Sequence, residues 1–149
     1  MRLPRTLAAI AALPALVLAA LLVLPQSAVA EPASKLTLTV TGIKEAKGAL
    51  MIAVFDEATY GKGKPVAATA VPVTGVTAST TIDLAPGKYG IQMFHDVDGD
   101  GKMGTNPFGM PIEPFGFSNN APAQFGPAAW KDAAFEVPAG ASAHAIALN

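Results

Sequence analysis

The sequence contains no cysteine, and its two arginines, Arg2 and Arg5, both lie within the first five residues. The lack of cysteine excludes disulfide bonds, thiolate metal ligands and a lipid anchor on an N-terminal cysteine. The lack of arginine beyond residue 5 removes the side chain best suited to hold phosphate through two parallel hydrogen bonds. Because the net charge is also slightly negative, at −1, we do not expect the chain to bind nucleic acid.

Residues 1–30 have the pattern of an export signal. They begin with the two arginines, continue as an almost unbroken apolar run over residues 7–24, and end in Ala28-Val29-Ala30, the pattern cleaved by signal peptidase. The alternative is an uncleaved anchor, but the run contains Pro14 and is slightly shorter than the ~20 residues of a spanning helix. We therefore predict a signal peptide over residues 1–30 and one domain over residues 31–149. We expect this domain in the periplasm or outside the cell, with no stable membrane span after cleavage.

The remaining sequence reads as short apolar strands separated by glycine and proline, and no segment has a clear helical period. Strict alternation over residues 36–41 indicates a strand with one buried face, whereas residues 50–55 are apolar on both faces, as in a central strand. Pro72 places its strand at a sheet edge. Strands are predicted at residues 36–41, 50–55, 66–73, 77–84, 89–94, 133–137 and 142–148. This pattern predicts an all-β fold, an immunoglobulin-like or transthyretin-like β-sandwich of about seven strands.

An acidic loop follows the fifth predicted strand. Asp96, Asp98 and Asp100 occupy positions one, three and five of a D-x-D-x-D-G pattern. Alternate carboxylates in such a loop can turn inward onto one cation, and glycine at position six permits the turn that brings the next carbonyl, that of Lys102, into reach. The loop therefore predicts a metal site.

The second half of the EF-hand pattern is missing, because Gly104 and Pro107 stand at positions nine and twelve. Asn106 and Glu113 are the further oxygen donors that we include in the predicted site, and Thr105 also lies nearby. Oxygen donors favour Ca²⁺ over zinc or copper, with the weak to moderate affinity of an incomplete ligand set. An ordinary solvated acidic turn and another metal ion remain as alternatives.

Residues 103–131 form a long segment with five of the ten aromatic residues and five prolines. Its prolines argue against regular strand or helix, and its aromatic content argues against disorder, so we expect an ordered irregular loop. In one interpretation the aromatic side chains cap an open end of the sandwich. In the other, a ligand surface for sugar rings or an apolar molecule is formed by Phe117, Asn119, Asn120 and Trp130.

Three blocks of the sequence resemble a known family. They are His-Asp-x-Asp-Gly-Asp-Gly-Lys-Met over residues 95–103, Gly-Met-Pro-x-Glu over residues 109–113, and Gly-Phe-Ser-Asn-Asn-Ala over residues 116–121. Together they are similar to exported bacterial proteins classed as domain of unknown function 2141. The resemblance implies a secreted or periplasmic β-sandwich with no assigned activity. Members often carry aspartate at the position of Gly104. This chain, with glycine there, therefore lacks one possible ligand.

The inventory of catalytic side chains is small. His95 and His144 are the only histidines, and Ser118 lacks the G-x-S-x-G context of a hydrolase nucleophile. We therefore expect a non-catalytic, calcium-stabilised protein that binds an envelope or extracellular ligand, for example a carbohydrate or protein, or acts in adhesion. The alternatives are a small calcium-dependent hydrolase that uses His95 with the three aspartates of the loop, and a purely structural envelope protein.

Overall fold

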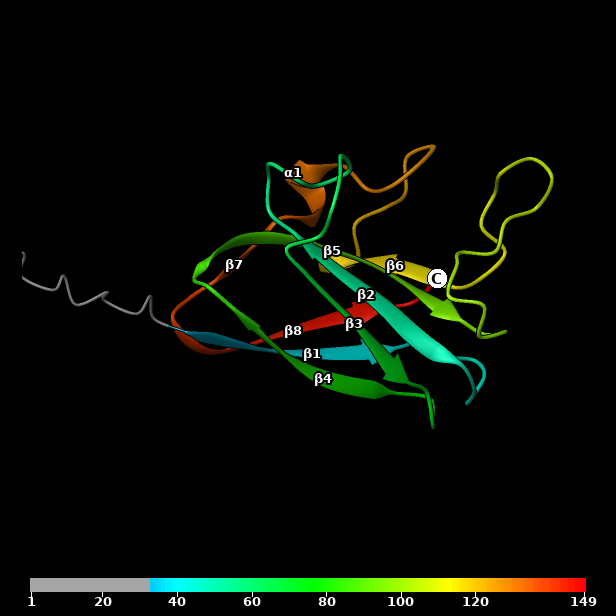
Figure 1. Ribbon diagram of the computed structural model, residues 1–149, viewed down its shortest axis with the longest axis horizontal. Coiled ribbons are helices and arrows are strands. Elements are labelled where there is room, and N and C mark those ends of the chain that lie inside the picture. The colour runs from blue at the N-terminus through cyan, green and yellow to red at the C-terminus, as the bar shows by residue number, and fades with distance from the viewer. Residues whose placement is uncertain (1–32) are drawn as a thin grey trace, which may run out of the picture.

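The computed structural model describes residues 33–149, so the predicted signal peptide over residues 1–30 lies outside the described part of the chain. Eight strands form two β-sheets (Figure 1). The strands are β1 Ser34–Thr41, β2 Ala49–Phe55, β3 Ala67–Pro72, β4 Ala78–Leu84, β5 Gly87–Asp96, β6 Phe115–Phe117, β7 Phe135–Val137 and β8 Gly140–Ala147. A short 3₁₀ segment, η1 Ser118–Asn120, and a short helix, α1 Trp130–Ala133, lie between β6 and β7.

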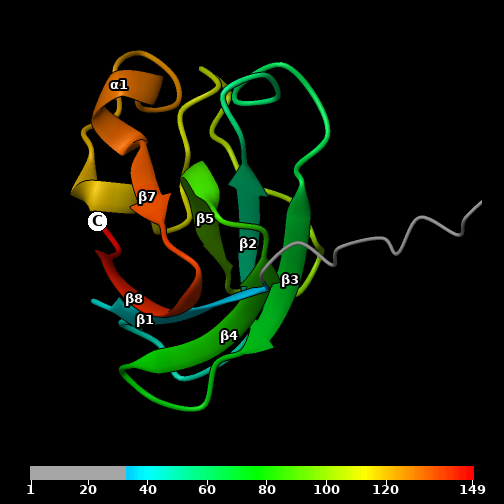
Figure 2. The ribbon, with the colours of Figure 1, turned by 90° about the vertical axis from the view of Figure 1, so that its left-hand side faces the viewer.

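The smaller sheet has the strand order β4-β1-β8, and the larger one has the order β3-β2-β5-β6, with β7 paired to the start of β5. Strands β1 and β8 run parallel, and the other paired strands of residues 33–149 are antiparallel. Strand β3, which ends at Pro72, is an edge strand, as predicted. The two sheets face each other as layers (Figure 2).

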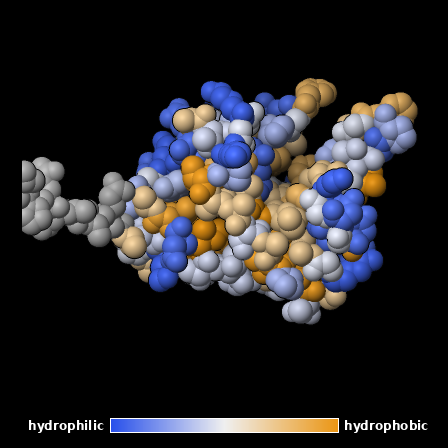
Figure 3. Space-filling view, in the orientation of Figure 1, coloured by the Kyte–Doolittle hydropathy of each residue, from blue (hydrophilic) through white to orange (hydrophobic). Residues whose placement is uncertain are grey.

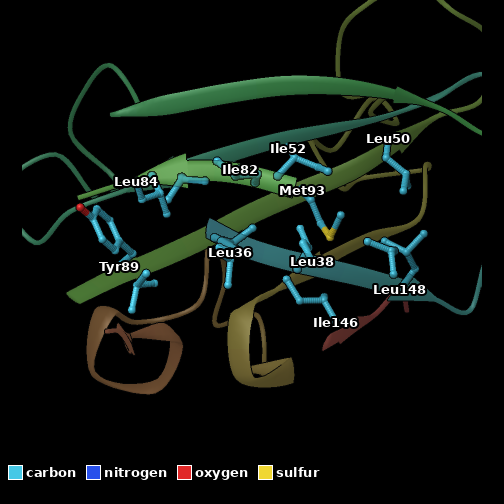
Figure 4. Close-up of a cluster of buried hydrophobic side chains, with 14 of the residues drawn as sticks. Leu36, Leu38, Leu50, Ile52, Ile82, Leu84, Tyr89, Met93, Ile146 and Leu148 are labelled. Carbon is cyan, nitrogen blue, oxygen red and sulfur yellow. The ribbon is translucent and has the colours of Figure 1, made fainter. Parts of the chain in front are cut away.

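Side chains from both sheets meet in one apolar core (Figure 4). In β1 every second side chain points inward, so Leu36 and Leu38 are buried while Thr37 is exposed. Strand β2 contributes Leu50 and Ile52 from the opposing sheet in the same way. The period-two pattern that predicted these strands is therefore the pattern of burial between the layers.

The all-β prediction is confirmed, but the segment 103–131 contains more regular structure than we expected. It includes β6, η1 and the start of α1. Strand β6 exists because its backbone pairs with β5, where Gln92 lies opposite Phe117 and Phe94 opposite Phe115. The prolines of this segment flank β6 and leave its backbone N–H groups free to pair. The expectation of an irregular segment throughout was therefore wrong.

A second apolar cluster covers one end of the outer face of the larger sheet. Phe117 and Tyr60 are buried in it, and Trp130 is half-buried against it. The rings of Tyr60 and Trp130 lie 5.3 Å apart between centroids, and the Tyr60 hydroxyl donates to the carbonyl of Ala128 at 2.9 Å. Gly90 lies beneath them, where a Cβ atom would approach within 2.8 Å of the Tyr60 ring. The described residues contain no helix long and apolar enough to cross a membrane.

Candidate functional site

The acidic loop wraps around the carboxylate of Asp96, the last residue of β5. Asp96 Oδ1 accepts hydrogen bonds from the backbone N–H groups of Gly99 at 2.8 Å and Asp100 at 3.2 Å, and Oδ2 accepts from Gly101 at 2.9 Å. Gly99 and Gly101 have φ values of 79° and 76°, which favour glycine. The loop therefore keeps Asp96, a residue that is 3% exposed, at its centre.

Glu113 closes the same site from the far side of the next loop. Its Oε1 accepts from Val97 N at 2.9 Å, and its Oε2 accepts from Gly104 N at 2.8 Å. Asp96, Asp98 and Glu113 each present a carboxylate oxygen, and these atoms lie within 4.8 Å of one another. Three carboxylate oxygens at this spacing could hold a metal ion.

The other predicted ligands have different partners. Asp100 Oδ1 accepts from the backbone N–H of Lys102 at 2.8 Å, and both residues are exposed. Asn106 Oδ1 accepts from Phe108 N at 2.9 Å and Met110 N at 3.0 Å, so it holds the tip of the following loop. The structure thus brings together three of the six predicted ligand residues and uses two others, Asp100 and Asn106, in backbone turns.

His95 lies on the inward face of β5 and is 0% exposed. Its Nε2 donates to the carbonyl of Lys47 at 2.7 Å, whereas its Nδ1 has no hydrogen-bond partner among residues 33–149. Successive side chains of a strand point to opposite faces, so the Asp96 carboxylate projects away from His95. The imidazole secures the turn that precedes β2 rather than the acidic loop.

Two of the predicted ligand-surface residues near Ser118 form hydrogen bonds to the backbone instead of facing a ligand. The two carboxamides bond to main-chain groups: Asn119 Nδ2 donates to the carbonyls of Asp132 and Ala134 at 3.0 Å each, and Asn120 Oδ1 accepts from Ala147 N at 2.8 Å. Phe117 is 8% exposed and Trp130 is half-buried, so neither stands out from the surface. The exposed aromatic side chains of the segment are instead Phe108 and Phe125.

Buried Ser118 links three parts of the structure. Its hydroxyl donates to the carbonyl of Ala133 and accepts from the backbone N–H of Ile91 at 2.8 Å. Next to it, the backbone N–H of Asn119 donates to His144 Nε2 at 3.1 Å, and the His144 ring stacks on Phe135 with centroids 4.0 Å apart. Burial lowers the pKa of His144, which keeps Nε2 able to accept this bond.

An apolar groove of about 1440 Å³, which the sequence did not lead us to expect, lies on the outer face of the larger sheet. Its floor is formed by Met51, Ala53, Ala68, Ala70, Gln92 and Phe94. One wall is the loop that carries Met103, Phe108 and Met110, and the other is the loop over residues 123–127. Figure 3 shows the notch between these two projecting loops. The volume exceeds the roughly 300–1,000 Å³ of common ligand pockets.

No charged residue lines the groove, and the polar side chains on this face are Gln92 and Gln124. The Gln92 amide nitrogen is shielded from solvent and makes no hydrogen bond of ordinary geometry. It lies close enough to Tyr60 to lower the pKa of that phenol, although burial has the larger effect and raises it. The sequence signal for the groove was present in residues 50–55, which are apolar on the outward face as well as the inward one.

The fold and these sites define a small protein of two β-sheets with an acidic loop beside an apolar groove. The chain belongs to the DUF2141 family, described as uncharacterized proteins conserved in bacteria, whose sequence model matches residues 38–145. The match spans the acidic loop and all residues that line the groove, and it confirms the family resemblance of the sequence blocks. No curated protein and no solved structure shows significant similarity to the chain.

Proposed function

We propose that the chain is an exported, non-catalytic binding protein that holds a neutral apolar molecule in the groove. The signal peptide over residues 1–30 and an immunoglobulin-like or transthyretin-like sandwich are parts of this proposal. The observation that carries it is the groove of about 1440 Å³ lined by methionine, phenylalanine and alanine side chains. Removal of apolar surface from water there contributes about 25 cal/mol per Å².

The lining also indicates the charge of the ligand. A carboxylate or ammonium group taken out of water needs a partner of opposite charge, and the groove offers none. A carbohydrate would need many hydrogen bonds, and two polar side chains, Gln92 and Gln124, supply few of them. A largely apolar, uncharged ligand therefore fits better than a sugar or an ion.

A fluorescent dye that is neutral and apolar, N-phenyl-1-naphthylamine, tests this function. We expect saturable binding with increased dye fluorescence, and weaker binding of its sulfonated, anionic analogue. Ala70→Trp places a large side chain on the exposed floor of the groove and should weaken dye binding at least about tenfold, which is 1.4 kcal/mol. Ala143→Trp, at an exposed position of β8 in the other sheet, is the matched control and should bind like the wild type. Equal binding by both variants would contradict the proposal.

The second part of the proposal is a Ca²⁺ ion held by Asp96, Asp98 and Glu113. Glu113 reaches from the end of the loop that forms one wall of the groove back to Val97 and Gly104. An ion shared by these three carboxylates would relieve their mutual repulsion. It would also fix the base of that wall.

Thermal unfolding with Ca²⁺, with Mg²⁺ and with chelator tests the ion. At one hundred times its dissociation constant, Ca²⁺ should stabilise the fold by about 2.7 kcal/mol, and the Tm should rise by several degrees. Asp98→Asn should abolish the rise, whereas Asp83→Asn, at an exposed position paired with Lys35, should keep it. An equal response to Mg²⁺ would show that the site does not select Ca²⁺. No response at millimolar Ca²⁺ would show that the loop is an ordinary acidic turn.

A further inference from the structure

Large apolar side chains that are exposed concentrate on two projections of the described part of the chain. The first projection is the loop over residues 103–112, on which Phe108 is 91%, Met110 62% and Ile112 67% exposed. The second is the loop over residues 122–129, on which Phe125 is fully exposed. Outside these loops, Val66 and Val76 are the exposed large hydrophobic residues among residues 33–149. The clustering exceeds the scattered exposure that ordinary surfaces show.

Both projections stand on the same side of the molecule, above the outer face of the larger sheet (Figures 1 and 2). Figure 3 shows that each ends in a hydrophobic tip, with the notch of the groove between them. The two tips are separate and convex, and no flat apolar surface joins them. A fluid layer adapts to such a shape, whereas a folded partner would need two matching holes.

The two projections carry almost no charge. Between Lys102 and Lys131 the sequence contains a single charged residue, Glu113, and its carboxylate is turned to backbone amides at the base of the first projection. The tips therefore offer no cation to an anionic surface. Uncharged, apolar tips of this kind suit contact with an uncharged apolar phase.

Several backbone groups of the first projection form hydrogen bonds within the loop. The Asn106 N–H donates to Met110 O at 2.9 Å, and the Gly109 N–H donates to Asn106 O at 2.8 Å. The Asn106 side-chain oxygen accepts from the N–H groups of Phe108 and Met110. A segment that enters an apolar phase must satisfy its backbone internally, because that phase supplies no partners.

The tip of the second projection is strained. Phe125 has a φ of 53°, a left-handed conformation that is unfavourable for a bulky residue. Its side chain is wholly exposed and gains no packing within residues 33–149 in return. Pro122 and Pro127 flank it and have no backbone N–H to satisfy. The strain holds an apolar ring away from the protein, as expected of a side chain that contacts a partner.

We propose that these two tips insert together into the surface of an uncharged, zwitterionic lipid layer and bring the mouth of the groove to that surface. Burial of Phe108, Met110 and Phe125 at the boundary between headgroups and acyl chains supplies the binding energy. Because no basic residue lies on either projection, binding does not depend on anionic lipid. This inference goes beyond the proposed function and does not require that the groove hold a ligand.

Sedimentation with phosphatidylcholine vesicles tests the proposal. The protein should bind these vesicles, with no gain from added phosphatidylglycerol and little change with salt. The double variant Phe108→Ser/Phe125→Ser should bind at least tenfold more weakly. Val76→Ser changes an apolar side chain that is 72% exposed between β3 and β4, and it should bind like the wild type. Unchanged far-ultraviolet circular dichroism and Tm would show that the double variant remains folded.

A second measurement reports insertion directly. Phe108→Trp and Phe125→Trp should each show a blue shift of the new tryptophan emission on vesicles and quenching by lipids brominated in the acyl chains. The proposal is overturned if the protein does not bind phosphatidylcholine, if binding requires phosphatidylglycerol, or if the double variant binds equally well. Self-association that the double variant abolishes, without vesicle binding, would show that a protein covers the tips. The Ala70→Trp variant, which blocks the groove, should still bind vesicles. A failure of dye binding would therefore contradict the proposed function but not the lipid-binding proposal.

Discussion

The two faces of strand β2 are both apolar, but their side chains are buried to different extents. Leu50 and Ile52 point into the closed core between the sheets, where they are 0% and 2% exposed. Met51 and Ala53 point to the outer face and form part of the groove floor, where they remain half-exposed. The inward-facing side chains of β2 lie in a closed core because the second sheet covers them completely. Loops cover the outer face only in part, so its apolar surface remains available to a ligand.

The largest expected effect is a difference in the free energy of unfolding between substitutions at two neighbouring residues of β2, one on each face. Leu50→Ala should lower the free energy of unfolding by about 2–5 kcal/mol because it leaves a cavity in the closed core. Met51→Ala should change it by about 0.5 kcal/mol or less, because that side chain faces an open groove. Urea unfolding of both variants measures the contrast. Similar losses in the two variants would show that the outer face is packed like the core.

An intermediate effect concerns the closed end of the outer face. Ser118→Ala removes a hydroxyl that serves Ile91 N and Ala133 O, and leaves both groups buried without this partner. Unfolding should become easier by about 1–3 kcal/mol. Ser79→Ala, which removes a hydroxyl from an exposed position of β4 that donates to Leu38 O, should cost about 0.5 kcal/mol or less. If Ser118→Ala lowered the free energy of unfolding no more than Ser79→Ala, the closed end would be no more tightly packed than the surface.

The smallest effect is a pH dependence at the edge of the same region. Burial lowers the pKa of His144 below its ordinary value of 6.5, so the unfolded chain binds more protons than the folded one as the pH falls through that value. The stabilisation from neutral His144 is therefore complete above about pH 6.5 and is lost below it. Unfolding measured at pH 7.5 and at pH 5.5 should show a smaller difference for His144→Gln than for the wild type. An equal difference would show that His144 titrates alike in both states.

The inner region could be predicted from the sequence because its evidence is local. Alternation in Leu36-Thr37-Leu38 predicts which side chains are buried, and the second sheet only has to cover them. The acidic loop was predictable in part for the same reason, since Asp96 and Asp98 lie two residues apart. Glu113 was included in the predicted site only as a nearby oxygen donor; its place beside them depends on how the intervening loop folds back.

The outer region could not be predicted because its structure depends on contacts between distant segments. Strand β6 has only three residues, and it is a strand because β5 offers it a partner. Asn119 and Asn120 suggested ligand binding, yet both adopt positive φ, at 58° and 50°, and their side chains bond to neighbouring backbone. Asparagine tolerates that conformation better than most residues, which is the signal that favoured a structural role.

The parallel pairing of β1 with β8 has a consequence for the order in which the chain folds. Ser34 lies opposite Gly140 and Thr41 opposite Ala147, so the central strand of the smaller sheet lacks one neighbour until the last strand has been made. Contacts this distant in sequence form slowly. A growing chain therefore cannot complete its smaller sheet before β8 has been synthesised.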